Sequence, residues 1–502
     1  MAVPTYDAVS HFPLSSKDPS HRFEVHNPAT GEVITTVQGG GVSEVEKAVE
    51  IANKAYNDDW RWRSPRERSM ILLQAAEHLS KHVRELSVLL SMENGKPVSQ
   101  ASEGDVPFLI AIFRYFASLI DKLPAEFYDQ GSIYASVIRE PYGVVAGILP
   151  FNWPPIHVGG KAAPALAAGN TVIIKPGEQA PLTVMRIVEL LQQVLPSGVI
   201  QAIPAMGPDV PQALVRHPDV KKVSFTGSTG AGIAVSKLAA ESITPVLLEL
   251  GGKNAFIVFD DADIDLAVRH AVDGGFFNQG EACTAASRVL VQAKVHDAFV
   301  AGMAAAVKRI KVGDGASDET HVGPLVTKVQ KERVEEYVRI GEAEGAKIEA
   351  QAPIPADPRL KNGYYVQPTL FTGVTRDMRI AKEEIFGPVV SVTKFDTYDE
   401  AISIANESEY GLVCGIFSQD MIKAMKASRQ VDAGMVFVNN YNRGLIGTPF
   451  GGAKHSGYGR EHCIETLHEF TRAKNIRIPS GLGAIPPWGK VSELVGDALP
   501  HV

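Results

Sequence analysis

Five short apolar segments alternate with helical patterns between Tyr142 and Glu249, and this alternation constrains the fold more than any other feature. The predicted strands are 144–149, 171–174, 199–203, 222–225 and 246–248. The helices predicted between them are 156–168, 182–195, 210–216 and 230–240. This order predicts right-handed βαβ units and a parallel sheet, and such sheets bind ligands beyond the carboxyl ends of their strands.

The flanking sequence carries weaker patterns. Ser43 and Glu46 form a capping-box pair at the start of a predicted helix, after an irregular or strand-like stretch from 1 to 42. Further predicted elements, in chain order, are helices at 66–90 and 107–120, an exposed strand at 132–138, strands at 255–258 and 288–291, and helices from Asp263 and His296. The polar, proline-rich segment 351–357 is typical of a surface loop.

Composition narrows the class of protein. The chain has 502 residues, of which 45% are apolar and 21% charged, so it is globular, with material for about three structural units. A net charge of −8 argues against a nucleic-acid partner. Three scattered cysteines, Cys283, Cys414 and Cys463, form no disulfide framework and indicate a reducing compartment. The sequence has no membrane-spanning segment and no signal peptide, so we predict a cytoplasmic protein that binds no membrane.

Two groups of residues could bind a dinucleotide. Gly227, Ser228 and Gly232 lie where a predicted strand opens into a helix, and free N–H groups at a helix start attract phosphate. Their spacing is not Gly-x-Gly-x-x-Gly, so a plain glycine-rich turn is the alternative. Glu178 follows the strand that ends at Lys175, where an acidic residue can bind ribose hydroxyls, unless it is a solvated loop charge. Both groups at one sheet edge favour a dinucleotide site.

Three more residues could carry chemistry. Cys283 lies among small residues in a predicted loop and could be a nucleophile, although free cysteines are more often inert and buried. Glu249 ends an apolar strand, where burial raises a carboxyl pKa toward that of a general base; a structural ion pair is the alternative. Asn152, in a proline-rich turn, could stabilise an oxyanion or only the turn. On these residues alone, a cysteine-dependent hydrolase remains a rival of a dehydrogenase.

Seven motifs, in family order, make the chain resemble the NAD(P)-dependent aldehyde dehydrogenase superfamily over nearly its whole length. They are PFNWP at 150–154, KPGE at 175–178, FTGST at 225–229, LELGGK at 248–253, QGEAC at 279–283, EEIFGP at 383–388 and PFGG at 449–452. Seven motifs in the same order as in the family are too many to match by chance.

The resemblance implies a role for each matching residue. Cys283 attacks the aldehyde carbon, Asn152 and the Cys283 backbone N–H hold the oxyanion, and Glu249 activates the water that hydrolyses the thioester. Lys161 and Glu461 match a proton path from that base. The residues that match NAD contacts are Lys175, Glu178, Gly207, Gly227, Ser228, Gly232, Glu384 and Phe386.

The chain departs from the family pattern at three places. Phe151 stands where a tryptophan is common, and Gly160 stands where many relatives carry a large side chain facing the aldehyde tunnel. The loop at 439–444 matches no substrate class, although its Arg443 could hold a carboxylated semialdehyde. We expect an open tunnel and a bulky apolar substrate, aromatic or medium-chain. The expected substrate residues are Trp153, His157, Gly160, Ala282, Thr284 and Phe450.

The resemblance thus predicts an α/β fold of the aldehyde dehydrogenase type. Its parts would be a Rossmann-type dinucleotide-binding domain (1–124 and 143–251), an α/β catalytic domain (252–469) and a small β oligomerisation arm with a tail (125–142 and 470–502). The predicted reaction is oxidation of an aldehyde to the acid with NAD by a homodimer or homotetramer, without a metal. NADP would bind more weakly because Glu178 repels a 2′-phosphate. The alternatives are a CoA-acylating semialdehyde dehydrogenase, which Glu249 argues against, and a catalytically silent protein on this fold.

Overall fold

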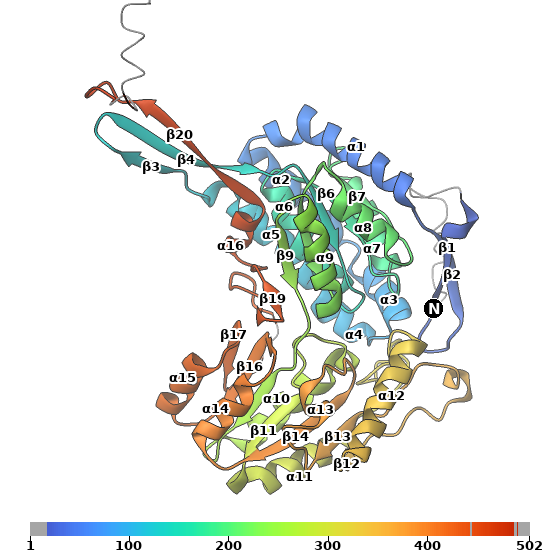
Figure 1. Cartoon of the computed structure of the whole chain (residues 1–502). Helices are drawn as coiled ribbons and strands as arrows, with labels where there is room; N and C mark the ends of the chain where they lie inside the picture. Colours follow the sequence, from blue (N-terminus) through green and yellow to red (C-terminus); the bar gives the residue numbers. More distant parts are fainter. Residues whose placement is uncertain (1–17, 442–443, 486–488, 490–502) are drawn as a thin grey trace, which may run out of the picture.

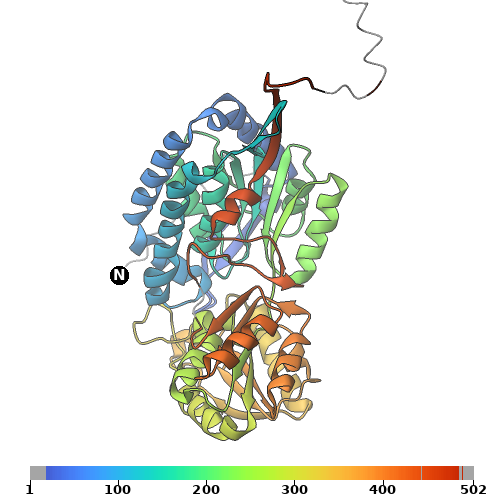
Figure 2. The ribbon, with the colours of Figure 1, turned by 90° about the vertical axis from the view of Figure 1, so that its left-hand side faces the viewer.

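Two lobes and a projecting arm make up the molecule (Figure 1). The computed structural model describes residues 18–441, 444–485 and 489. A view turned by 90° has one lobe above the other, with the arm leaving the upper lobe on the side away from the lower one (Figure 2). Each lobe is built around one large sheet, and the arm is a third, smaller sheet.

The sheet of the upper lobe has the strand order β19-β9-β8-β5-β6-β7. Its five parallel strands are β5 (Val144–Ile148), β6 (Thr171–Lys175), β7 (Ile200–Ala202), β8 (Val220–Thr226) and β9 (Val246–Glu249). They confirm the predicted parallel sheet. Because β5 lies between β6 and β8, the sheet grows in opposite directions from β5, and at such a switch point the expected ligand crevice lies beyond the carboxyl ends of β5 and β8.

Helices cover both faces of this sheet because successive strand residues point to opposite faces. Val145 of β5 packs among α2 (Pro65–Ser80), α5 (Val106–Leu119), α6 (Pro154–Ala167) and α7 (Leu182–Gln192). Its neighbours Val144 and Ala146 pack on the other face among α1 (Val42–Asp58), α8 (Asp209–Arg216) and α9 (Thr229–Glu241). The four helices predicted between the strands are α6 to α9, so that part of the prediction is confirmed.

Two local predictions in this lobe are wrong, and one strand was missed. Helix α1 is capped by Gly41, whose N–H donates to Glu44 at 2.9 Å, and not by Ser43 with Glu46. The helix predicted at 66–90 is two helices, α2 and α3 (Val83–Asn94). A sixth strand, β19 (Gly457–Tyr458), pairs antiparallel with β9, and its two residues are too few to carry a sequence pattern.

The lower lobe contains a seven-stranded sheet in the order β12-β13-β14-β11-β10-β16-β17. Its strands are β10 (Ala255–Val258), β11 (Arg288–Gln292), β12 (Lys347–Gln351), β13 (Thr369–Thr372), β14 (Val389–Phe395), β16 (Val413–Phe417) and β17 (Met435–Val438). Its main helices are α10 (Ile264–Phe276), α11 (His296–Val307), α12 (Lys328–Ala343), α14 (Tyr398–Asn406) and α15 (Met421–Gln430). Every neighbouring pair is parallel except β12 with β13, so the second βα series is also confirmed. Residues 352–357 form the expected loop after β12.

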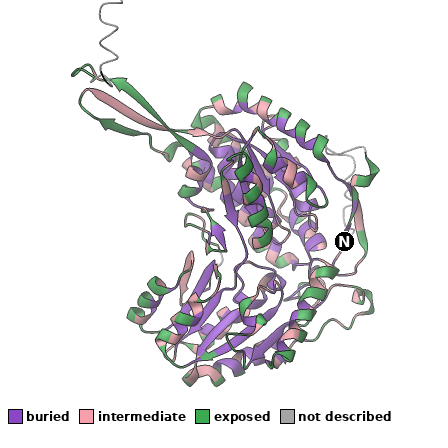
Figure 3. Cartoon of the chain, in the orientation of Figure 1, coloured by how far each residue is buried: buried purple, intermediate pink, exposed green. Residues whose placement is uncertain are grey.

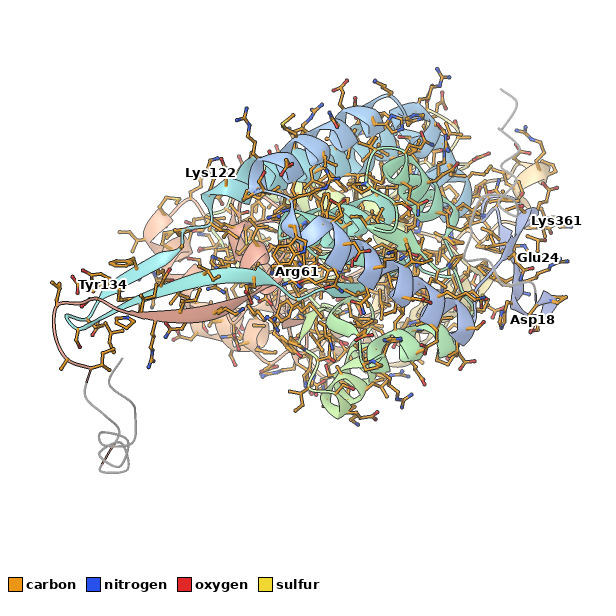
Figure 4. The ribbon with its side chains drawn as sticks, turned by 90° about the horizontal axis from the view of Figure 1, so that it is seen from above. Asp18, Glu24, Arg61, Lys122, Tyr134 and Lys361 are labelled. Atoms are coloured by element: carbon orange, nitrogen blue, oxygen red, sulfur yellow. The ribbon has the colours of Figure 1, made fainter. Side chains whose placement is uncertain are left out.

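The arm consists of β3 (Glu126–Asp129), β4 (Ile133–Pro141) and β20 (Thr471–Pro479), with β4 in the middle. The predicted exposed strand at 132–138 is therefore confirmed as the start of β4. The arm is coloured mainly exposed and intermediate, whereas the two large sheets are mainly buried (Figure 3). Seen from above, Tyr134 lies out on the arm, and Asp18, Glu24 and Lys361 lie at the opposite end of the molecule (Figure 4).

The remaining elements are short. They are β1 (Arg22–His26), β2 (Val33–Gln38), α4 (Val98–Gln100), a π-helical turn (Ala101–Asp105), α13 (Arg379–Lys382), β15 (Tyr410–Gly411), β18 (Ala453–Lys454) and α16 (Ile464–Glu469), with single 3₁₀ turns elsewhere. No helix within the described residues is both long and apolar enough to cross a membrane.

Candidate active site

Cys283 lies in the lower lobe, between the 3₁₀ turn Phe277–Gly280 and β11. Gly280 has a φ of +69°, and a Cβ on it would lie 2.3 Å from the carbonyl oxygen of Gly387, so only glycine fits this bend. Asn254, just before β10, donates from Nδ2 to the carbonyl oxygen of Cys283 at 2.7 Å. The sheet therefore fixes the loop that carries the thiol.

The surroundings of Cys283 favour the neutral thiol. Removal from bulk water, followed by the negative charges of Glu384 and Glu249, raises the pKa of Cys283 to about 12. The backbone N–H groups of Thr284 and Cys283 act in the opposite direction but are outweighed. The thiol is therefore protonated at neutral pH and needs a proton acceptor before it can react as a thiolate.

Glu249, the last residue of β9, is a buried carboxylate, and neither of its oxygens has a hydrogen-bond partner among the described residues. Burial and then the negative charge of Glu461 raise its pKa well above that of a free glutamate, while Lys161 and Arg460 lower it less. The ion-pair alternative is thus wrong for Glu249 itself. Gly451 keeps the space beside it open, since a Cβ there would lie 2.7 Å from Oε1 of Glu249.

A buried ion pair lies next to this carboxylate. Lys161 of α6 donates from Nζ to Oε1 of Glu461 at 2.8 Å and to Oγ1 of Thr226 at 2.7 Å. Burial raises the pKa of Glu461, but the charges of Lys161 and His462 outweigh it, so the pKa is lowered overall. One glutamate of the neighbouring pair is therefore held ionised, whereas ionisation of the other, Glu249, is disfavoured.

Asn152 follows β5 and is held at both its backbone and its side chain. Its carbonyl oxygen accepts from Nζ of Lys96 at 3.0 Å and from Nδ2 of Asn278 at 3.2 Å. Its Nδ2 donates to the carbonyl oxygen of Glu281, two residues before the thiol, at 3.1 Å. The proline-bounded turn thus attaches directly to the loop that carries Cys283.

A cavity of about 630 Å³ joins the two lobes at this point. Cys283 and Glu249 both line it. Its other described lining residues are Gly104, Asp105, Phe108, Trp153, Ile156, His157, Thr226, His270, Asp273, Phe277, Thr284, Asn440, Tyr441, Gly444, Phe450, Glu461 and His462. Aromatic rings dominate the apolar part, and Trp153 stacks on Phe277 with their centroids 5.6 Å apart. Such a wall suits a flat or elongated apolar group.

Most of the predicted catalytic and substrate residues meet at this cavity. Seven of them line it: Cys283, Glu249, Glu461, Trp153, His157, Thr284 and Phe450. Asn152, Lys161 and Ala282 are buried directly behind its wall.

The expectation for Gly160 is wrong. A Cβ on Gly160 would lie 3.0 Å from Cε1 of His462 and 3.2 Å from Oε2 of Glu461. The space left by the missing side chain is filled by the His462 ring from a distant part of the chain, which itself lines the cavity. Gly160 therefore makes room for His462 and does not widen the tunnel.

The start of α9 offers a cradle at the crevice between β5 and β8. Ser228 is the N-cap, and its Oγ accepts from the N–H of Ala231 at 3.3 Å. A Cβ on Gly230 would meet nothing within 4 Å, whereas one on Gly232 would lie 2.5 Å from Leu250. Gly232 thus lets the helix approach β9 closely, and Gly230 leaves open space where a phosphate group could sit. Gly227 connects this turn to the active-site strand, because its N–H donates to the carbonyl oxygen of Glu249 at 3.1 Å.

Three further cofactor candidates meet at the end of β6. Oε2 of Glu178 accepts from the N–H of Gly207 at 2.9 Å, and a Cβ on Gly207 would meet nothing within 4 Å. Lys175 is largely buried, and burial lowers its pKa while Glu178 raises it. A carboxylate, an amine and open backbone thus lie near one another, which suits a ribose with its attached base.

Glu384 and Phe386 lie on the other side of the crevice. Oε1 of Glu384 accepts from the N–H of Gly252 at 3.0 Å, and burial raises the pKa of Glu384 to about 7. The ring of Phe386 meets the ring of Phe151 edge-on, with centroids 5.8 Å apart. Phe151, the smaller stand-in for tryptophan, therefore still links the Asn152 turn to this segment.

Sequence reasoning missed several residues at the site. Lys96 and Asp105 form a buried ion pair of 2.6 Å beneath the Asn152 turn. His462 follows Glu461 directly and could have been noticed for that reason. Phe108 and Phe277 look like ordinary helix-core residues, so no sequence signal marked them as cavity wall. Arg443 lies outside the described residues.

The family model of the aldehyde dehydrogenase family matches residues 15–476, and the chain therefore belongs to that family. An aldehyde dehydrogenase of Monascus ruber is 57% identical over 482 residues, which is 96% of each chain. A betaine aldehyde dehydrogenase of Bacillus subtilis is 38% identical, over 90% of this chain and 92% of the relative. The chain is accordingly an aldehyde dehydrogenase, and the silent-protein alternative is rejected.

Solved structures agree with this assignment. A betaine aldehyde dehydrogenase of Staphylococcus aureus in complex with NAD⁺ superposes with a TM-score of 0.90 at 37% identity, covering 93% of both chains. A protein called PnpE from Pseudomonas sp. WBC-3 gives the same TM-score at 39% identity, covering 93% of this chain and 96% of PnpE. The predicted fold class is therefore confirmed. Within the described residues, no group of three or more His, Cys, Asp or Glu side chains could hold a metal ion.

Proposed function

We propose that the chain oxidises an aldehyde to its carboxylic acid with NAD, through a covalent intermediate on Cys283. The observation that carries the proposal is that Cys283 and Glu249 line one cavity, and that the buried Glu249 carboxylate has no hydrogen-bond partner in the part of the chain that the structure describes. The thiolate would attack the aldehyde carbon, and the Asn152 amide together with the Cys283 N–H would stabilise the oxyanion. Loss of hydride leaves a thioester on the sulfur.

Glu249 is the proposed base for hydrolysis of that thioester. Its raised pKa makes the ionised carboxylate a stronger base toward water than an ordinary surface glutamate. Glu461 and Lys161 are the proposed route by which the proton leaves, because they are buried beside Glu249 and joined at 2.8 Å. This base also argues against CoA acylation, since water competes for the thioester.

The residues around the crevice fit a dinucleotide. NAD, when bound, supplies the acceptor for the hydride. Lys175, Glu178 and Gly207 would hold the adenosine end, and Gly227, Ser228 and Gly232 would shape the helix start that meets the pyrophosphate. Glu384 and Phe386 would place the nicotinamide ribose and ring. Similar structures contain NAD.

For the substrate we propose a bulky apolar aldehyde, aromatic or medium-chain. The support is now the aromatic wall of Phe108, Trp153, Phe277 and Phe450, because Gly160 does not open the tunnel. No lysine or arginine stands among the described lining residues, whereas several carboxylates do, which disfavours a carboxylated semialdehyde. Each Å² of apolar substrate removed from water contributes roughly 25 cal/mol.

We also propose that the three parts of the chain have the functions predicted from the sequence. Residues 1–124 and 143–251 would form the NAD-binding domain, and 252–469 the catalytic domain. Residues 125–142 and 470–502 would serve association into a homodimer or homotetramer.

Burst kinetics with two variants test the catalytic roles. Cys283→Ala should abolish NADH formation while NAD still binds. Glu249→Gln should give about one NADH per active site and then little turnover, because hydride transfer precedes deacylation. Loss of the burst and of turnover to the same degree in Glu249→Gln would contradict the assignment of the hydrolytic base.

A panel of aldehydes tests whether the aromatic wall of the cavity selects the substrate. The kcat/KM for benzaldehyde and octanal should exceed that for acetaldehyde and succinic semialdehyde. Phe450→Ala should reduce this difference in kcat/KM. If acetaldehyde or the semialdehyde leads with the wild type, the substrate proposal is wrong.

A further inference from the structure

The side-chain amide of Asn152 has both ends engaged. Nδ2 donates to the carbonyl oxygen of Glu281 at 3.1 Å, and Oδ1 lies 3.2 Å from Nε2 of His157. A carbonyl oxygen only accepts, so the amide nitrogen must face Glu281 and the amide oxygen must face the imidazole. Nε2 of His157 therefore carries a proton and donates it to Asn152.

His157 is held in the form that this bond requires. Its ring is buried, and burial together with the positive charges of Lys161, His462 and Lys96 lowers its pKa well below the ordinary value. The imidazole is therefore neutral over the working pH range. With its single proton on Nε2, it has one donor, and that donor is committed to Oδ1 of Asn152.

The backbone of the same turn is fixed separately. Nζ of Lys96 is bound to Asp105 at 2.6 Å, donates to the Asn152 carbonyl oxygen at 3.0 Å and lies 4.1 Å from the centre of the Trp153 ring. These contacts restrain the main chain but leave rotation of the side-chain amide open. Only Glu281 and His157 contact that amide by hydrogen bonds in the described structure.

We propose that His157 is a positioning residue that fixes the orientation of the Asn152 amide, so that the second N–H of Nδ2 faces the oxyanion formed at Cys283. The inference rests on the proposed function. Without the imidazole donor, the amide can rotate or turn its oxygen toward the site, where it would repel the oxyanion. Because one oxyanion donor is worth about 10²–10³ in rate, partial misalignment should cost about tenfold.

This role differs from the substrate contact expected for His157 from the sequence. A substrate contact would alter the ranking of aldehydes, whereas a positioning role slows all of them by the same factor. The two roles also differ in their dependence on Asn152, since a residue that acts through Asn152 has no effect once the amide is gone.

The test uses His157→Leu, His157→Gln, Asn152→Ala and the double variant Asn152→Ala/His157→Leu of the full chain. Glutamine places an amide N–H near the position of Nε2 and serves as the matched rescue. We expect His157→Leu to lower the rate constant of the NADH burst about tenfold for benzaldehyde and acetaldehyde alike. His157→Gln should restore it to within about threefold, and NAD affinity should stay unchanged. In the Asn152→Ala background, His157→Leu should have no further effect.

Several outcomes would overturn the proposal. A wild-type burst rate in a folded His157→Leu, an equal loss in both backgrounds, or a changed ratio of the two aldehydes would each do so. Thermal unfolding of every variant separates these results from loss of folding. If His157→Leu does not fold, the test passes to His157→Gln. A folded, active His157→Gln variant whose burst rate does not depend on Asn152 also contradicts the proposal. A wild-type enzyme without any burst would instead overturn the proposed function, and this role with it.

Discussion

At the scale of single residues, the proposed active site disfavours the ionised forms of both reacting groups. The thiol of Cys283 has a pKa of about 12, and the carboxyl of Glu249 has one well above its ordinary value. Ionisation of one group disfavours ionisation of the other, because the negative charge on Glu249 is one cause of the high pKa of Cys283. The cofactor-free enzyme should therefore keep an unreactive thiol.

Alkylation of Cys283 tests this state. A raised thiol pKa means that the thiolate fraction grows about tenfold per pH unit below that pKa. The rate of labelling by iodoacetamide in the cofactor-free enzyme should thus rise about tenfold per unit between pH 7 and 9, with no plateau. Cys283→Ala is the control for labelling at Cys414 and Cys463. A plateau below pH 8 would show that the thiol is already ionised and contradict this account.

Glu178 should decide between the two cofactors. Its carboxylate accepts from Gly207 and would accept from a free ribose 2′-hydroxyl, but would repel a 2′-phosphate at short range. Glu178→Gln should lower the ratio of kcat/KM for NAD to that for NADP by about tenfold or more. Glu241→Gln removes an exposed carboxylate at the far end of α9 and should leave the ratio unchanged. An unaltered ratio in Glu178→Gln would remove Glu178 from cofactor selection.

At the scale of elements, the sequence predicted what depends on repeating patterns. All five parallel strands and the four helices between them follow from apolar segments alternating with helical ones, and they are present. Strand β19 was missed because two residues carry no period. The cap of α1 was misplaced because Gly41 and Glu44, not the expected Ser43 and Glu46, form the pair at the helix start.

The residues of the candidate site also differ in whether the sequence could predict them. Cys283, Glu249 and Asn152 stand at strand ends or in motifs, so the sequence could point to them. The filling of the Gly160 space by His462 could not be foreseen, because it is a contact between residues about 300 positions apart that no local pattern records.

Two glycines of α9 give a paired prediction about helix packing. Gly232→Ala would place a Cβ 2.5 Å from Leu250, so it should lower the free energy of unfolding by about 1–3 kcal/mol. Gly230→Ala adds a methyl group where nothing lies within 4 Å, and helix propensity should leave it neutral or slightly stabilising, within about 1 kcal/mol. Urea unfolding of the two variants measures the difference. Equal stabilities would mean that α9 does not need its close approach to β9.

At the scale of the whole molecule, the arm exposes one apolar face. In its register Phe127 lies opposite Ser136, which lies opposite Ile476, and Tyr134 lies opposite Ile478. Since alternate residues share a face, Phe127, Tyr134, Ile476 and Ile478 all point to the same side. Phe127 and Ile478 are 66% and 54% exposed in the single chain. An apolar face on a sheet with free edges favours association with a second copy.

Light scattering after gel filtration tests that association. The wild type should have a mass that is a multiple of 54.0 kDa, and Phe127→Asp/Ile478→Asp should shift it to a smaller multiple. Val329→Asp, at an exposed position at the start of α12 in the lower lobe, is the matched control and should keep the wild-type mass. A wild type that is already monomeric, or a double variant of unchanged mass, would contradict the role of the arm.

The order of the elements along the chain has a consequence for the synthesis and folding of the enzyme. Strand β19 and Glu461 come from the late part of the chain, yet they complete the upper lobe, whose other strands are made first. Lys161 meets Glu461 across 300 residues. A ribosome that has synthesised both Cys283 and Glu249 has therefore still to add the acid that accompanies the base. Catalytic competence therefore requires that this late segment is synthesised and packs onto the upper lobe, after both Cys283 and Glu249 are in place.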